Sequence, residues 1–164
     1  MGPAFVEPGL PEDVVLAPAG EEDVEAVFRI RTAVSHNHLD RAALAERGIT
    51  PAWVRHLVRH GALRIWGAWT PERDMVGFCA VKPQAREIFG LFVVPGWQGR
   101  GVGSALLDTA VDHLWRGGAG TIGLETGRGT PAHGFYLRRG WVEVASDPEA
   151  EDVPLRLRTG AAGR

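Results

Sequence analysis

The 164-residue chain has the length of one ordinary domain, and its 45% hydrophobic and 23% charged residues exclude a disordered protein. Its net charge of -2 lacks the basic excess that supplies most nucleic-acid affinity, so we expect no nucleic-acid partner. No apolar run reaches the roughly 20 residues that span a bilayer, no secretory signal is visible, and the single cysteine, Cys79, lies in an apolar run. We therefore expect no membrane partner and a cytoplasmic location.

The domain organisation predicted from composition is one globular unit between two short terminal segments. Residues 1–12 contain two glycines and three prolines, which indicates a flexible leader. The last five residues, 160–164, consist of small residues and one arginine and indicate a tail. Residues 13–159 are then a single domain.

The first elements alternate quickly along the chain. A short strand is expected at residues 14–16, and a helix follows the acidic residues 21–23 and continues to about residue 34. A second helix opens at residues 50–51, where a threonine cap is followed by proline in the first turn, and it stops near Gly61.

Three strands and a long helix occupy the middle of the sequence. The strands are expected at residues 63–69, 75–81 and 87–94, and the polar turn 70–74 favours a hairpin between the first two. The helix is expected at residues 102–116, where apolar residues recur at helical spacing.

The last third continues with a strand at residues 121–125 and a helix from Thr130-Pro131 to Gly140. Two further strands are expected at residues 141–145 and 153–158. The order predicts a mixed α/β fold, with an antiparallel first half and a βαβ-like second half.

The most informative segment is the glycine-rich turn Gln98–Gly103, which lies between a buried strand and an amphipathic helix. Free N–H groups and the helix dipole form an anion site at such a position, and glycines let the backbone approach a pyrophosphate closely. The Rossmann pattern fails because Leu106 stands where its third glycine would fall. The P-loop pattern fails because the only lysine is Lys82, far upstream.

Two ordered motifs resemble those of the GNAT superfamily of N-acetyltransferases. The first is Gln-x-x-Gly-x-Gly at residues 98–103, preceded by Val-x-Pro at residues 93–95. The second is Phe-Tyr-x-x-x-Gly-Trp at residues 135–141, where the family usually has phenylalanine in place of Trp141. The resemblance covers roughly residues 75–145. It implies a central mixed, mostly antiparallel twisted sheet of about six to seven strands flanked by about four helices.

The resemblance also implies which residues hold acetyl-coenzyme A. The strand before the turn bulges in the family, and Gly90 is a plausible place for that bulge. The implied contacts to the pantetheine arm and the pyrophosphate are Leu91, Phe92, Val93, Gln98, Gly99, Arg100, Gly101, Val102, Gly103 and Ser104. In the alternative interpretation, these residues form an ordinary strand–helix connection.

Tyr136 occupies the position of the family's general acid, which protonates the departing thiolate; the alternative is an aromatic packing residue. Glu87 stands where several members carry a catalytic glutamate that accepts the amine proton, although it could equally pair with Arg86. Glu125 is the second candidate. Many members place asparagine where this chain has Gly129, so Arg128 or the loop backbone would have to replace that contact.

The acceptor side is less defined. The segment 35–40, with His36 and His38, covers the acceptor site in the family and otherwise forms a polar loop or a helix cap. Two histidines two residues apart resemble metal ligands, but no further ligand is spaced to complete a site, so we expect no metal.

The resemblance therefore implies an N-acetyltransferase with acetyl-coenzyme A as co-substrate. Its acceptor would be a primary amine of a small molecule or a protein N-terminus, which attacks the acetyl group directly. The chain would act as a monomer or homodimer. A non-catalytic acyl-coenzyme A-binding or sensor domain is the alternative.

Overall fold

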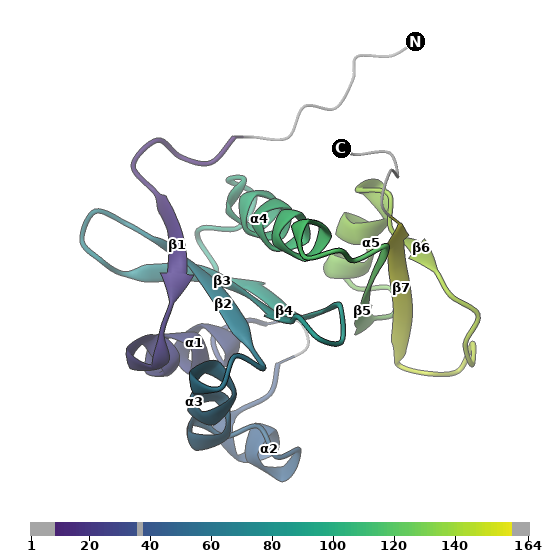
Figure 1. Ribbon diagram of the computed structural model, residues 1–164, viewed down its shortest axis with the longest axis horizontal. Coiled ribbons are helices and arrows are strands. Elements are labelled where there is room, and N and C mark those ends of the chain that lie inside the picture. The colour runs from purple at the N-terminus through teal and green to yellow at the C-terminus, as the bar shows by residue number, and fades with distance from the viewer. Residues whose placement is uncertain (1–8, 36–37, 159–164) are drawn as a thin grey trace.

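A seven-stranded sheet with helices on both faces is the architecture of the computed structural model, which describes residues 9–35 and 38–158 (Figure 1). The elements in chain order are β1 (Val15–Ala19), the 3-10 helix η1 (Glu21–Asp23), α1 (Val24–Arg31), α2 (Arg41–Glu46), α3 (Pro51–Arg59), β2 (Arg64–Trp69), β3 (Met75–Lys82), β4 (Glu87–Val93), α4 (Val102–Arg116), β5 (Thr121–Gly127), α5 (Pro131–Arg138), β6 (Val142–Glu143) and β7 (Asp152–Arg158). The predicted α/β class is confirmed. The described residues form five α-helices, one more than the approximate count expected, because α2 was not foreseen.

The strand order in the sheet is β1-β2-β3-β4-β5-β7-β6. All neighbouring pairs run antiparallel except β4 and β5, which are parallel. Parallel neighbours need a crossover connection, and α4 supplies it. The mostly antiparallel sheet and its βαβ unit therefore agree with the prediction.

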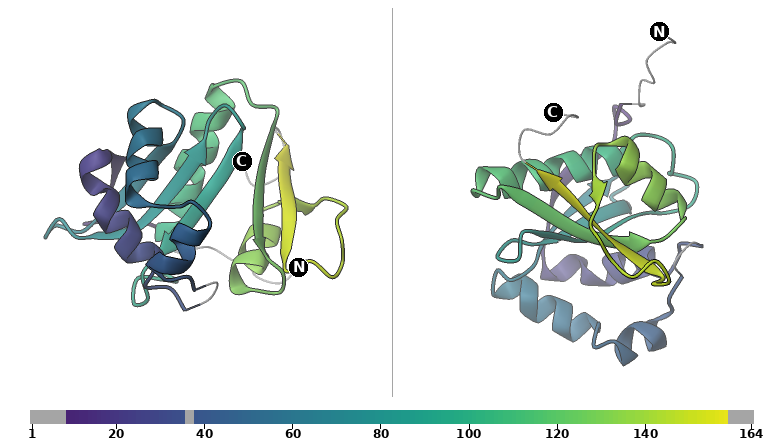
Figure 2. Two further views of the ribbon diagram at one scale, coloured as in Figure 1. Left: turned by 90° about the horizontal axis from the view of Figure 1, so that it is seen from below. Right: turned by 90° about the vertical axis from the view of Figure 1, so that its right-hand side faces the viewer.

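The sheet separates two apolar cores. Leu106 of α4 and Ile122 of β5 lie on one face and are inaccessible to solvent, whereas Ile30 of α1 and Ile65 of β2 belong to the core on the other face. Figures 1 and 2 show the same division, with α1, α2 and α3 on one side of the sheet and α4 on the other. An amphipathic helix buries one stripe against the sheet, which explains why each face has its own helical cover.

Side-chain caps fix where three of the helices begin. The hydroxyl groups of Thr50 and Thr130 accept hydrogen bonds from backbone N–H groups at the start of α3 and α5, each followed by proline. Asp40 accepts from the N–H of Ala43 at 2.8 Å and begins α2. The expectation of a helix cap within residues 35–40 is thus met by Asp40.

Parts of the predicted terminal segments lie outside the described residues, namely residues 1–8 of the leader and the tail 160–164. Among the residues that are described, no helix has the length and apolar character needed to cross a membrane.

Candidate functional site

The parallel strands β4 and β5 meet at one end only. Glu87 pairs with Gly123, whose N–H donates to the C=O of Arg86 at 3.0 Å. No other pair joins these two strands in the described parts of the chain, and Figure 2 shows them lying apart. A cavity of about 700 Å³ occupies the opening between them and is lined by residues from both faces of the sheet. We call it the central cavity.

A register shift in β4 begins this opening. Neighbouring residues of β3 pair with Ile88 and Gly90, so Phe89 is an extra residue in β4. Ile88 and Leu91 consequently pack into the same core although they are three positions apart, whereas regular strand geometry would place them on opposite faces. This agrees with the bulge expected near Gly90. Residues 91–93, which follow it, line the central cavity.

The glycine-rich loop closes one side of the central cavity. Gly99 and Gly101 have φ values of 75° and 84°, a left-handed conformation that glycine adopts without steric cost. Gly101 is the N-cap of α4, and the first turn of a helix leaves N–H groups without intrahelical partners. The side-chain amide of Gln98 donates to the C=O of Val93 at 2.9 Å and fastens the loop to the end of β4. The loop can therefore present free amides to an anion.

Eight of the ten residues expected to hold the coenzyme line the central cavity: Leu91, Phe92, Val93, Gln98, Gly99, Gly101, Gly103 and Ser104. The side chains of Arg100 and Val102 lie elsewhere. The Arg100 guanidinium lies 4.8 Å from the centre of the Trp97 ring, and Val102 is buried in the core beneath α4. Backbone amides and helix dipole, rather than the Arg100 side chain, therefore make this end of the cavity attractive to an anion.

Tyr136 lines the central cavity and retains only 6% of its exposure. Its ring packs edge-on against Phe135 and Trp141, with centroids 5.3 and 5.7 Å away. Burial, and secondarily the neighbouring Cys79, raises the pKa of the Tyr136 phenol above its ordinary value. The phenol is therefore protonated at neutral pH, the state that a general acid requires.

The two candidate glutamates occupy different places. Glu87 lies at the closed end, where β4 still pairs with β5, and does not belong to the wall of the central cavity. Glu125 lies in β5, is exposed, and does belong to that wall.

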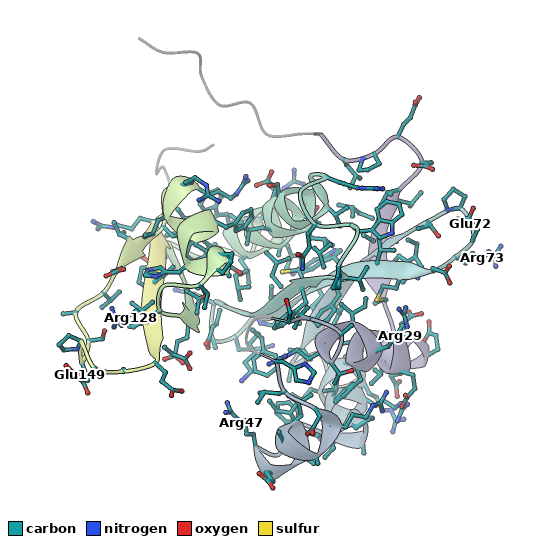
Figure 3. The ribbon with its side chains drawn as sticks, turned by 180° about the vertical axis from the view of Figure 1, so that it is seen from behind. Arg29, Arg47, Glu72, Arg73, Arg128 and Glu149 are labelled. Atoms are coloured by element: carbon teal, nitrogen blue, oxygen red, sulfur yellow. The ribbon has the colours of Figure 1, made fainter. Side chains whose placement is uncertain are left out.

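In the loop between β5 and α5, the Arg128 side chain does not belong to the wall of the central cavity. Arg128 donates from Nε to the C=O of Ala150 at 3.1 Å, and a second guanidinium nitrogen donates to the C=O of Asp147 at 3.3 Å. Figure 3 shows Arg128 beside the loop that carries Glu149. Thr126 and Gly127 at the end of β5, and Thr130 at the end of the loop, do line the cavity.

His133 fixes the same loop, a role that the sequence did not reveal. Its Nδ1 accepts from the N–H of Gly129 at 3.0 Å, so its Nε2 carries the proton when the ring is neutral and donates to the Glu143 carboxylate at 2.6 Å. The ring is 9% exposed. Its partners are four and ten residues away along the chain, and no motif links them.

The opposite side of the central cavity is built from α1, α2 and the segments around them. Arg31 and Arg47 line it together with apolar side chains that include Phe28, Leu39 and Ile49. Figure 3 shows Arg47 projecting from the α2 region toward the part of the molecule that holds β5 and β7. Ser35 and Leu39 of the segment 35–40, expected to cover the acceptor site, line this half, whereas Arg31 and Arg47 were not singled out from the sequence.

The two histidines considered as acceptor contacts have different outcomes. His36 lies outside the described residues, and His38 places Nδ1 3.0 Å from the C=O of Val34. Across residues 9–35 and 38–158, no three His, Cys, Asp or Glu side chains gather as a metal site would require.

Comparison with known proteins identifies this architecture. A sequence profile of the Acetyltransferase (GNAT) family matches residues 26–141. The PaiA N-acetyltransferase of Thermoplasma acidophilum, solved in complex with coenzyme A, aligns with a TM-score of 0.75 and 16% identity over 88% of this chain and 98% of its own.

Two further structures show the same fold. A GNAT acetyltransferase from Staphylococcus aureus has a TM-score of 0.71 and 16% identity over 88% of this chain and 98% of its own. A dodecameric spermidine N-acetyltransferase from Vibrio cholerae has a TM-score of 0.68 and 14% identity over 92% of this chain and 96% of its own. A search of the curated proteins gave no significant match.

Proposed function

The chain belongs to the GNAT acetyltransferase family, and from this premise we propose that it transfers the acetyl group of acetyl-coenzyme A to a primary amine. One observation carries the proposal: the central cavity passes through the sheet between β4 and β5. The glycine-rich loop and Tyr136 lie on one side, and α1 and α2 lie on the other. Donor and acceptor can therefore enter from opposite faces and meet in the opening.

Binding of the donor, acetyl-coenzyme A, would depend on backbone groups of β4 and α4. After Glu87, the edge of β4 that faces β5 has no strand paired with it in the described structure. This edge can therefore receive the extended, amide-bearing pantetheine arm as an added strand. Gly101, Gly103 and Ser104 at the start of α4 offer backbone N–H groups and the positive end of the helix dipole to the pyrophosphate. The coenzyme A complex of the Thermoplasma acidophilum relative supports this use of the shared fold.

Tyr136 supplies the proton for the leaving group. The amine nitrogen attacks the acetyl carbonyl carbon, a carbon–nitrogen bond forms, and collapse of the tetrahedral intermediate breaks the carbon–sulfur bond. The sulfur receives the phenolic proton of Tyr136, which regains one from solvent. The step requires a protonated phenol, which is the state of Tyr136 at neutral pH.

The amine must also lose a proton. Glu125 belongs to the cavity wall and Glu87 does not, so we assign the base to Glu125 acting directly or through water. Glu87 could take part only through a chain of waters from the closed end of the opening.

The proposal is tested with the full chain. Titration with acetyl-coenzyme A in a calorimeter should give saturable binding, and thiol release with a panel of primary amines, spermidine included, should show turnover. Saturable binding without turnover on any amine would refute catalysis and indicate a coenzyme-binding sensor. Absence of binding at millimolar acetyl-coenzyme A would refute both.

The Tyr136→Phe variant tests the assigned mechanism because it removes one hydroxyl and keeps the packing against Trp141. We expect kcat to fall by about 10²- to 10⁴-fold, the usual contribution of a general acid. The dissociation constant for acetyl-coenzyme A and the melting temperature should stay close to those of the parent. Unchanged turnover would remove Tyr136 from the mechanism.

A further inference from the structure

Two arginines converge on the acceptor half of the central cavity. Arg31 is the last residue of α1, and Arg47 is the residue that ends α2. Both line the cavity, although 16 positions separate them in the sequence. The fold therefore places two positive charges where the acceptor is expected to enter.

The position of Arg31 is fixed by packing. Its guanidinium carbon lies 4.5 Å from the centre of the Phe92 ring, near the end of β4. Phe92 belongs to the core on the face covered by α1, α2 and α3, opposite the face on which α4 begins. Arg31 thus lies close to the strand that would hold the acetyl-bearing arm, but on the far side from the glycine-rich loop.

The positive charge of Arg47 acts on the guanidinium of Arg31. The pKa of Arg31 is lowered, first by burial and then by the positive charge of Arg47. Among the described residues, no carboxylate forms an ion pair with Arg47. Like charges brought together in one half-enclosed space favour an anionic ligand, because it offsets their repulsion.

The charged residues of the whole cavity wall also favour an anionic ligand. Among the described residues, the charged wall residues are Arg31, Arg47 and Arg138 against one carboxylate, that of Glu125, so this lining is net positive. Arg138 comes from α5, on the same side of the sheet as Tyr136 and therefore on the donor side. Arg31 and Arg47 remain on the acceptor side.

We propose that the acceptor is an amine that also carries a carboxylate, bound by Arg31 and Arg47, with an apolar body. This inference rests on the proposed acetyl transfer and names its substrate class. Guanidinium groups bind carboxylates through paired, charge-assisted hydrogen bonds. The apolar body would lie against the neighbouring apolar wall, of which Phe28, Leu39 and Ile49 are part. An apolar amino acid is the smallest molecule with this chemistry, and a polycationic amine is disfavoured.

The experiment compares amines that differ only in the carboxylate. Leucine is paired with 3-methylbutylamine, and phenylalanine with 2-phenylethylamine, in a thiol-release assay at saturating acetyl-coenzyme A. We expect kcat/KM to favour the carboxylate-bearing member of each pair by about tenfold or more, the value of a hydrogen bond to a charged group. Equal or better use of the plain amines, or of spermidine, would overturn the proposal.

Variants connect this preference to the two arginines. Arg47 is exposed, so Arg47→Met should fold normally. In this variant the ratio of kcat/KM for leucine to that for 3-methylbutylamine should fall toward one, mainly because the KM for leucine rises. Arg31→Met should act in the same way, and Arg31→Lys, which keeps the charge, should restore part of the preference if the first variant melts early. Arg55→Met is the matched control, since Arg55 contacts Glu25 on the protein surface and lies outside the cavity wall. A preference that survives in both Arg31→Met and Arg47→Met would overturn the assignment.

Failure of the proposed function can be told apart from failure of this inference. If no amine is acetylated, calorimetric binding of leucine and 3-methylbutylamine to the protein saturated with coenzyme A still measures the carboxylate preference. Tighter binding of leucine that is lost in Arg47→Met supports the inference even then. Equal binding of the two ligands refutes it.

Discussion

Replacing Gly103 by alanine separates the stability of α4 from its use as an anion site. Gly103 is the second residue of α4 and belongs to the wall of the central cavity. A Cβ built there meets one atom, Cγ2 of Val93, at 3.7 Å, which is ordinary van der Waals contact. The added methyl group therefore fits the free protein and projects into the space that a bound pyrophosphate would approach.

The two expected effects of this substitution have opposite signs. Alanine in a helix is favoured over glycine by about 0.5–1 kcal/mol, so the melting temperature should rise by roughly 1–4 °C for a domain of this size. Loss of one amide hydrogen bond to a charged phosphate costs about 1.5–3 kcal/mol. At 1.4 kcal/mol for each tenfold change, the dissociation constant for acetyl-coenzyme A should rise by roughly 10- to 150-fold.

Calorimetric titration and thermal unfolding of the same variant measure both effects. Gly120→Ala serves as the control, because a Cβ there meets no atom within 4 Å and Gly120 lies outside the cavity wall. The control should bind acetyl-coenzyme A as the parent does. An unchanged dissociation constant for Gly103→Ala would refute the close approach of the pyrophosphate to this turn, and a lower melting temperature would refute the packing argument.

Three further predictions concern the base, the acid and the core. Glu125→Gln should lower kcat by about 10²- to 10⁴-fold at unchanged coenzyme affinity, and a larger loss in Glu87→Gln would assign the base to Glu87 instead. Because burial raises the pKa of Tyr136, kcat/KM should climb as the amine and its base lose protons and should not decline as the pH passes the ordinary tyrosine value. A decline at the ordinary tyrosine value near 10 would contradict that assignment. Leu106→Ala empties a fully buried position and should cost about 2–5 kcal/mol in urea unfolding, whereas a cost below about 1 kcal/mol would show that the core closes over the gap.

Long elements with a regular repeat of apolar residues were predictable from the sequence. The helix expected at residues 102–116 has the same bounds in the structure, since its apolar stripe is continuous and glycines follow it. In contrast, α2 has six residues and only Leu44 fully buried. A helix this short shows no measurable repeat of apolar residues, and only the capping residue Asp40 indicates it in the sequence.

The local structure around the predicted coenzyme site could be foreseen because its parts are contiguous. A strand, a glycine turn and a helix start follow one another within residues 87–104, so local rules determine how they lie. The side chain of Arg100 departs from the expectation. It follows the attraction of the Trp97 ring at 4.8 Å, a tertiary contact that the glycine spacing does not encode.

The acceptor half depends on distances that no local pattern records. Nothing in the sequence links Arg31, at the end of a predicted helix, with Arg47, which follows a helix that the sequence did not predict. They come together because the ends of α1 and α2 lie at the same cavity, where Arg31 also packs on Phe92 of β4. The same holds for His133 and Glu143, which meet through the pairing of β6 with β7.

One irregularity in the sheet explains why these separate parts form a single site. Glu87 and Gly123 hold β4 and β5 together at one end, and the extra residue Phe89 turns β4 out of register immediately afterwards. A bulge bends its strand, and the pairing of β4 with β5 does not continue beyond it in the described residues. Along the opening, β4 and β5 lack the backbone hydrogen bonds that a continuous parallel pair of strands would form. In the function proposed above, an extended coenzyme arm would replace those bonds, and the same opening would let the acceptor reach the acetyl group.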